Sequence, residues 1–320
     1  MIITTLKEEH IKEASKLAFD NYLEERRKIE TLPEIKDIPD LSWFVENGYG
    51  VAAIDNDELL GFIACFNPWD GAFDSKAKGT FTPIHAHGCV KENRAKIYEM
   101  MYQKMAEKLV EDGVLYHGIA LYEHDSDAIR AYFHNGFGHR CADAIRKMEQ
   151  LPNVKCVPGI SFEEIASEDV RLVRSLRRAL SEHLGESSCF MYSTEEQFQE
   201  WIERKEKNES RIFVAKEEEK IIAFIEISDD GENFVTDHAK MKNICGAFCL
   251  LEYRGKQMFQ NLLNYLIEIL QKEGYQYLGV DYESFNPTAF HFWGKNFEAY
   301  TCSVTRRIDE GILRKYTGEK

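Results

Sequence analysis

One segment of the sequence places basic side chains between an apolar strand and a long helix. Residues 246–263 are typical of a strand, then the turn Arg254-Gly255-Lys256, then a helix. A helix that begins at such a turn leaves several backbone N–H groups unpaired at the positive end of its dipole. These groups favour phosphate and pyrophosphate as ligands. We therefore expect an anion site at this turn, to which Arg254 and Lys256 add positive charge.

Carboxylates on neighbouring strands are candidates for a proton acceptor. Glu226 lies on the predicted strand 220–227, and Asp281 and Glu283 lie at the end of the predicted strand 275–282. A carboxylate beside a reacting group can act as a general base. The alternative for each is a solvated carboxylate at a strand end with no part in chemistry.

Two histidines and two cysteines also share strand faces. His85 and His87 alternate along a strand, so their imidazoles point to one side, which is half of a metal site. No cysteine or carboxylate completes that set at the usual spacing, so we expect a polar lining and no metal. Cys245 and Cys249 favour core packing. No histidine lies near Cys249 in the sequence, which argues against a nucleophilic thiol.

Strands and helices of regular spacing position these residues. The order predicts the α/β class, with a mixed sheet and helices on both of its faces. The strands expected in the second half are 159–165, 211–216, 220–227, 243–251, 275–282 and 300–307, and the helices are 170–180, 194–207, 255–272 and 287–295.

The two halves of the chain repeat one another. Matching positions recur about 160 residues apart, as internal duplication would produce. The recurring pairs are Cys89 and Cys249, Arg94 and Arg254, Gly113 and Gly274, and Phe137 and Phe297. The 320 residues suit two domains. We expect them at 1–150 and 159–320, with a proline-containing linker at 151–158.

Composition narrows the function classes. The chain has 40 Lys and Arg against 55 Asp and Glu, a formal charge of −15, so we expect neither nucleic-acid nor membrane binding. A cationic partner such as an amine suits this charge. No apolar run is long enough for a membrane span, and the first residues lack a signal-peptide pattern. The eight cysteines form no C-x-x-C pair, which favours reduced thiols in the cytoplasm.

Several of these motifs resemble the GNAT superfamily of acetyl-CoA-dependent N-acyltransferases. The sequence Glu252-Tyr-Arg-Gly-Lys256 is similar to the turn after that family's fourth strand. Asn286-Pro-Thr-Ala289, Trp293 and Phe297 fall at family positions farther along. The first half adds Ala128, Tyr132 and Gly136-Phe137. The resemblance covers nearly the whole chain as two GNAT-like domains in tandem.

The resemblance implies that the C-terminal domain binds acetyl-CoA as acyl donor and passes the acetyl group directly to a small-molecule or peptidyl amine. It places the pantetheine arm along Cys249, Leu250 and Leu251, with Asn286 as a further contact. It places the pyrophosphate on Arg254 and on the backbone of Gly255, Lys256, Gln257, Met258, Phe259 and Gln260.

The sequence departs from the family pattern in both turns. Gln257 and Phe259 stand where the family has small residues, and the first copy has Ile97 and Glu99 there. A carboxylate at Glu99 would repel a pyrophosphate. We therefore expect the N-terminal domain to be a degenerate copy with a structural or substrate-shaping role.

The residue that protonates the leaving thiolate is also in question. The family often uses a tyrosine on the last helix, where this chain has Trp293 in the second copy and Tyr132 in the first. The catalytic residues therefore stay unassigned. One alternative is an acyl-CoA-binding or interaction module without turnover, and another is acyl transfer to a hydroxyl acceptor.

Overall fold

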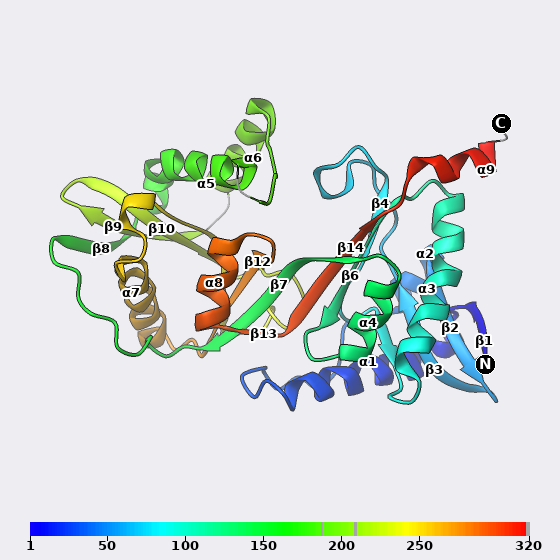
Figure 1. Ribbon diagram of the computed structural model, residues 1–320. Coiled ribbons are helices and arrows are strands. Elements are labelled where there is room, and N and C mark those ends of the chain that lie inside the picture. Colours follow the sequence, from blue (N-terminus) through cyan, green and yellow to red (C-terminus); the bar gives the residue numbers. More distant parts are fainter. Residues whose placement is uncertain (187, 208–209, 318–320) are drawn as a thin grey trace. The chain divides into compact units, whose positions relative to one another are not determined.

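The computed structural model describes residues 1–186, 188–207 and 210–317. They form two compact units (Figure 1). Unit 1 comprises Met1–Ala142 together with the segment from Ala299 onward, and unit 2 comprises Asp143–Glu298. The mixed sheets and the helices that cover them place the protein in the α/β class, as expected from the sequence.

Unit 1 contains a strand-rich body and two long helices. Its strands are β1 (Ile2–Thr5), β2 (Gly50–Asp55), β3 (Glu58–Ala64), β4 (Gly79–Thr82), β5 (His87–Cys89), β6 (Tyr116–Tyr122), the first part of β7 (Gly138–Lys147) and β14 (Thr301–Arg307). Its helices are α1 (Ile11–Arg26), α2 (Ser42–Asn47), α3 (Arg94–Glu111), α4 (Ser126–His134) and α9 (Arg314–Thr317), with short 3-10 turns η1 (Glu8–His10), η2 (Ala72–Asp74) and η5 (Glu310–Leu313).

The strands of unit 1 belong to two sheets. In one, β1, β2, β3 and β5 pair antiparallel in that order. In the other, β4 pairs parallel with β6, which is followed by β14 and β7. The apolar stripe of α3, including Tyr98, Met101 and Met105, packs on both sheets and forms the main core of the unit.

The expected domain limits are wrong at the C-terminal end. The segment 300–307 is a strand, as predicted, but it belongs to unit 1 and not to the second copy. β14 pairs with β6 along its whole length, from Thr301 opposite Tyr122 to Arg307 opposite Tyr116 (Figure 1). Strand propensity shows that a segment is extended, whereas its partner depends on long-range packing. The sequence pattern therefore could not identify this pairing.

Unit 2 has the same order of elements. Its strands are β8 (Ile160–Ile165), β9 (Arg211–Glu217), β10 (Lys220–Ser228), β11 (Met241–Cys249), β12 (Tyr277–Glu283), the last part of β7 and the start of β13 (Glu298–Ala299). Its helices are α5 (Arg174–Glu186), α6 (Glu195–Lys207), α7 (Met258–Lys272) and α8 (Pro287–Asn296), with the 3-10 turns η3 (Ser167–Val173) and η4 (Leu251–Tyr253).

The sheet of unit 2 runs in the order β8, β9, β10, β11, β12, with helices on both faces. Phe213 of β9 contacts Tyr265 of α7, whereas its neighbour Val214 packs with Leu176 of α5. Successive side chains of a strand point to opposite faces, so α5 and α7 cover opposite sides. The expected linker lies inside this unit, where Leu151 exchanges two hydrogen bonds with Asn264, of 2.6 and 3.3 Å.

All eight cysteines are free thiols. Among the helices in the described parts of the chain, none is both long enough and apolar enough to cross a bilayer.

Candidate functional site

Two parallel strands of unit 2 separate midway along their length. β11 and β12 pair over four residues, from Met241 opposite Tyr277 to Ile244 opposite Val280. Beyond a bulge, β11 continues along β10 alone, as far as Cys249 opposite Ala223. Backbone hydrogen bonds of an antiparallel pair alternate between the two sides of a strand. Because Leu250 donates to Ile222 on β10, the backbone N–H groups of Ala247 and Cys249 point to the opposite side, where the strands have parted.

The turn after β11 holds six backbone N–H groups for which the described residues supply no acceptor. Tyr253 and Arg254 still donate to the carbonyls of Leu250 and Leu251, and the next backbone bond is from Asn261 to Gln257. Between them, the N–H groups of residues 255–260 donate to no residue in the described part of the chain. Such a row at the start of a 15-residue helix is a strong anion site.

A strained residue shapes this turn. Gly255 and Gln257 both have positive φ, +75° and +62°, and Gln257 is the N-cap residue of α7. A side chain other than glycine in this conformation costs about 1 kcal/mol or more. The side chain of Gln257 offsets part of this cost because its Oε1 atom accepts from the backbone of Lys155 at 2.9 Å. The segment after Leu151 therefore supports the turn.

A cavity of about 830 Å³ opens beside the turn and the separated strands. Eight of the eleven residues predicted to bind the cofactor line it: Cys249, Arg254, Gly255, Gln257, Met258, Phe259, Gln260 and Asn286. The other three do not. Leu250 packs against the core beneath α5, Leu251 is 72% exposed on η4, and Lys256 points to solvent.

Several lining residues were not predicted. They come from the segment 151–154, from Leu180 and His183 of α5, and from α8. Most residues of α8 line the cavity, among them Ala289, Phe292 and Trp293. The aromatic character of this helix is visible in the sequence. In contrast, His183 is one polar residue on a charged helix, and no sequence signal distinguishes it.

Arg254 reaches into the cavity, and no carboxylate in the described part of the chain pairs with it. Its Nε atom donates to the carbonyl of Cys249 at 2.9 Å, and its guanidinium lies 5.2 Å from the ring centroid of Phe248. The groups beside it are His183 and Asn286. Burial and the charge of Arg254 lower the pKa of His183, so the imidazole is neutral near pH 7. Its buried Nε2 atom has no hydrogen-bond partner among the described residues.

Glu226, a candidate base, is held in a buried ion pair. Its carboxylate lies 2.8 Å from Arg177 and 3.4 Å from Lys205, and both Glu226 and Arg177 are essentially inaccessible to solvent. Removing either partner would leave an uncompensated buried charge, so this pair has a structural role.

Asp281 and Glu283 lie on β12 beyond Val280, the last residue of that strand that pairs with β11. Asp281 is exposed, but the surrounding protein still desolvates it. Together with the charges of Glu232 and Asp143, this raises its pKa to about 8. Glu283 lies two residues farther along. Burial raises the pKa of the Cys249 thiol to about 11, which disfavours a nucleophilic thiolate.

Trp293 of α8 and Tyr132 of α4 occupy corresponding positions in the two copies of the repeat. Trp293 is 6% exposed and packs edge-on against Phe259 and Phe292 at the cavity wall. Tyr132 is fully buried in the core of unit 1, and its hydroxyl has no partner among the described residues. Neither residue supplies an accessible acid.

The equivalent separation of strands in unit 1 is filled by a side chain. β4 pairs with β6 and β5 pairs with β3, so the strand that corresponds to β11 is divided in two. His87 lies where unit 2 has Ala247, and its Nε2 atom donates to the carbonyl of Ala120 on β6 at 2.8 Å. Tyr98 completes the contact, donating to Nδ1 at 2.8 Å. Burial lowers the pKa of His87 to about 4, so the ring is neutral.

The arginine of unit 1 is neutralised by carboxylates. Arg94 lies 2.9 Å from Glu24 and 3.0 Å from Asp125, and it donates to the carbonyl of Cys89 at 2.9 Å. Burial opposes its charge, but the two carboxylates raise its pKa. The hollow of about 490 Å³ beside it is lined by these carboxylates and Glu25.

The expected reason for the loss of the first anion site is wrong in part. Glu99 lies inside α3, half-buried beside His134, and not in the turn. The turn before α3 spans only residues 90–93, whereas the turn before α7 spans 250–257. The shorter turn, the carboxylates around Arg94 and the imidazole of His87 account for the difference.

Residues 176–298 match the model of the acetyltransferase (GNAT) family. This match runs from α5 to the end of unit 2 and includes the separated strands, the turn and α8. A search of curated proteins found no match.

Two solved structures resemble nearly the whole chain. A GCN5-related N-acetyltransferase from Sphaerobacter thermophilus is 10% identical, with a TM-score of 0.56 over 96% of this chain and 95% of that chain. The glucosamine N-acetyltransferase region of a fungal multi-domain GH3 β-N-acetylglucosaminidase is 11% identical, with a TM-score of 0.51 over 95% of this chain and 38% of that chain. At these identities the likeness shows a shared fold.

Proposed function

We propose that unit 2 binds acetyl-CoA and transfers its acetyl group to an amine, because residues 176–298 match the model of the GNAT acetyltransferase family. The observation that supports this most is the row of N–H groups at 255–260 beside Arg254, for which the structure describes neither a backbone acceptor nor a carboxylate partner. Together they form a site for two adjacent phosphates.

The cavity suits the rest of the donor. The pyrophosphate would lie on the N–H groups of 255–260, and the pantetheine arm would extend along β11 between the separated strands. There the N–H groups of Ala247 and Cys249 would bond to it as a neighbouring strand does. Asn286 would contact the arm from the start of α8, at the cavity wall.

The reaction is a direct acyl transfer. The amine nitrogen attacks the thioester carbonyl carbon, forming the C–N bond, and the C–S bond breaks. A β11 backbone N–H stabilises the negative charge that develops on the carbonyl oxygen. The amine loses one proton to a base, and the CoA thiolate takes up one proton.

Asp281 is our candidate for that base. It lies beyond the last shared pair of β11 and β12, and its raised pKa of about 8 makes it a good proton acceptor. The carboxylates that raise this pKa, Glu232 and Asp143, also favour a cationic amine as the acceptor.

Trp293 motivates a second candidate function, acyl-CoA binding without turnover. It occupies the helix position at which GNAT enzymes often carry an acidic tyrosine, and an indole does not protonate a thiolate. Binding and turnover can be separated experimentally because they differ in the release of free thiol.

Isothermal titration of the full-length protein with acetyl-CoA tests the proposal. We expect saturable binding of one molecule per chain, and its absence would refute both candidate functions. A thiol-release assay over polyamines, amino sugars and peptide N-termini then distinguishes them. Turnover with any amine would support the enzyme, whereas tight binding with no turnover across the panel would favour the binding module.

A further inference from the structure

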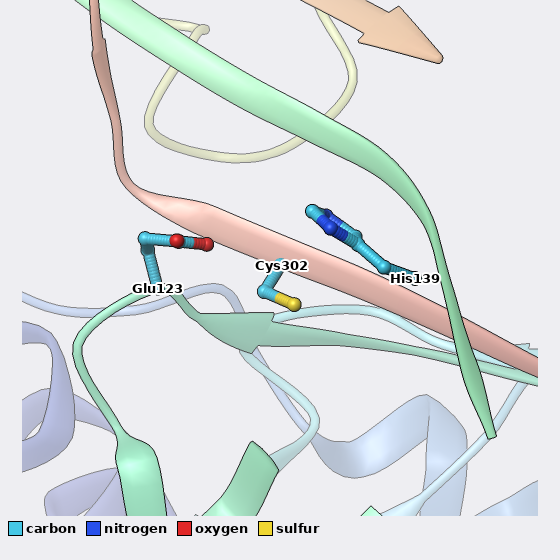
Figure 2. Close-up of side chains that lie close together, drawn as sticks. All are labelled: Glu123, His139 and Cys302. Carbon is cyan, nitrogen blue, oxygen red and sulfur yellow. The ribbon is translucent and has the colours of Figure 1, made fainter. Parts of the chain in front are cut away.

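Three residues of unit 1 with metal-binding side chains meet away from the acyl-CoA site. Glu123, His139 and Cys302 each offer one ligand atom, and these atoms all lie within 4.8 Å of one another (Figure 2). Cys302 is 4% exposed, and the other two are half-buried. The established fold and the proposed acetyl transfer use none of them.

The sheet register explains why these residues meet. Cys302 of β14 lies opposite Leu121 of β6, and Glu123 follows two residues after Leu121, on the same face. On the other side of β14, His139 of β7 lies opposite Val304, two residues from Cys302. Cys302 therefore sits between two diagonal neighbours on adjacent strands. Three elements of the fold hold the three side chains.

Two of the ligand atoms are buried without partners. The Oε2 atom of Glu123 and the Nε2 atom of His139 make no hydrogen bond within the described residues. Buried polar atoms in folded proteins nearly always have a partner, and an exception calls for a missing ligand or ion. A hydrogen bond from the ring of His139 to the backbone of Cys141 orients the imidazole. The imidazole of His139 extends toward the cluster in Figure 2.

A bound divalent cation would give the two unpartnered atoms a ligand, and its charge would compensate the carboxylate and the thiolate that are desolvated here.

We propose that Glu123, His139 and Cys302 bind a zinc ion in unit 1. Thiolate, imidazole and carboxylate together suit zinc, whereas magnesium and calcium prefer oxygen ligands alone. A tetrahedral zinc holds its ligand atoms roughly 3.3–3.8 Å apart, so small side-chain rotations close the site. Three protein ligands leave the fourth position for water.

The zinc would fasten the C-terminal strand. Cys302 belongs to β14, while Glu123 and His139 belong to the N-terminal part of the same unit. A metal bond across the three strands would therefore stabilise the pairing of β14 with β6 and β7.

Metal analysis of the full-length protein tests this site. After reconstitution with zinc and dialysis, we expect one zinc per chain by mass spectrometry of the metal. Cobalt should give a thiolate-to-metal absorption band, and zinc should raise the melting temperature. Glu123→Gln, His139→Gln and Cys302→Ser should each weaken zinc affinity by roughly 100-fold or more, as expected for loss of a direct ligand.

Cys65→Ala is the matched control, a buried cysteine of the same unit outside the cluster. It should retain one zinc per chain. If Cys302→Ser does not fold, the nearly isosteric Glu123→Gln decides the question. A wild-type chain without stoichiometric zinc, zinc content unchanged in the ligand variants, or a cobalt complex without the thiolate band would each overturn the proposal.

Discussion

The two units build the same turn around an arginine, and only one leaves that arginine available to a ligand. In unit 1, Arg94 pairs with Glu24 of α1 and with Asp125, the N-cap of α4. In unit 2, the groups near Arg254 are His183 of α5 and Asn286, the N-cap of α8. Both arginines also bond to the last carbonyl of the preceding strand.

This comparison shows how one fold can lose or keep an anion site by a few exchanges. Carboxylates satisfy the guanidinium of unit 1 within the protein, whereas a neutral imidazole and an amide leave a positive charge unmatched. Between the separated strands, the units differ in the size of the side chains. In unit 1 the large side chain of His87 faces Ala120, whereas the corresponding residues of unit 2 are Ala247 and Asp281.

The largest effect on acetyl-CoA binding should come from giving Ala247 of unit 2 the histidine side chain that unit 1 has at the corresponding His87. Ala247→His would place a ring in the space between the separated strands, where we expect the pantetheine arm. Binding of acetyl-CoA should fall by roughly 100-fold or more, because ring and ligand cannot share that volume. Titration calorimetry measures the loss. Ala247→Ser, a small change at the same position, should bind nearly as the wild type does, and equal loss in both variants would contradict this view.

The next largest effect is expected from replacing the arginine of each unit by glutamine, which should affect the two units differently. Arg254→Gln should weaken acetyl-CoA binding roughly 10- to 150-fold, the range for a charged hydrogen bond of about 1.5–3 kcal/mol. Arg94→Gln should leave the affinity unchanged and lower the melting temperature, because it leaves two half-buried carboxylates without their cation. Affinity lost equally in both variants would show that the units do not differ as described.

A smaller effect should follow from converting one partner of Arg254 to its counterpart in unit 1. Asn286→Asp keeps the N-cap of α8, since aspartate caps as well as asparagine. Its carboxylate would partly neutralise Arg254 and repel the pyrophosphate, so we expect about tenfold weaker binding at neutral pH. Asn286→Ser caps the helix without charge and is the control. Comparable binding by the aspartate and serine variants would rule out the charge as the cause.

The last prediction concerns the pH dependence of turnover and not the affinity for acetyl-CoA. Asp281 accepts a proton only when it is ionised, and its pKa is raised to about 8. Turnover of an amine, measured as kcat/KM, should therefore rise with pH through about 8 in the wild type. Asp281→Asn should remove that limb and lower activity by roughly 100-fold, the scale of general-base catalysis. An unchanged limb would exclude Asp281, and Glu283→Gln is then the next variant.

Local pattern was enough to predict most elements of the fold. Helical spacing identified α7, and hydrophobic alternation identified β9 and β10. The limits were less accurate: the helix expected from 255 begins at Met258, because the turn extends to Gln257 in a left-handed conformation. Such backbone geometry has no signal in a glutamine side chain.

Long-range relations could not be predicted from the sequence. The repeat aligned Arg94 with Arg254, but it did not show that Glu24 neutralises the first, since 70 residues separate that pair. The residues of the proposed zinc site lie on β7, on β14 and directly after β6, and they match no short motif. The identity of the strand that completes unit 1 depends on the same kind of tertiary pairing.

The origin of β14 has a consequence for the order of folding. Domains usually fold as they leave the ribosome, the N-terminal one first. Here the sheet of unit 1 stays incomplete until residue 307 has been synthesised, although the unit begins at residue 1. Unit 2 is complete earlier in synthesis. Until β14 has been synthesised, β6 has an unpaired edge, and such an edge can pair with strands of other chains. A stop codon before Thr301 would therefore leave that edge exposed permanently and favour aggregation.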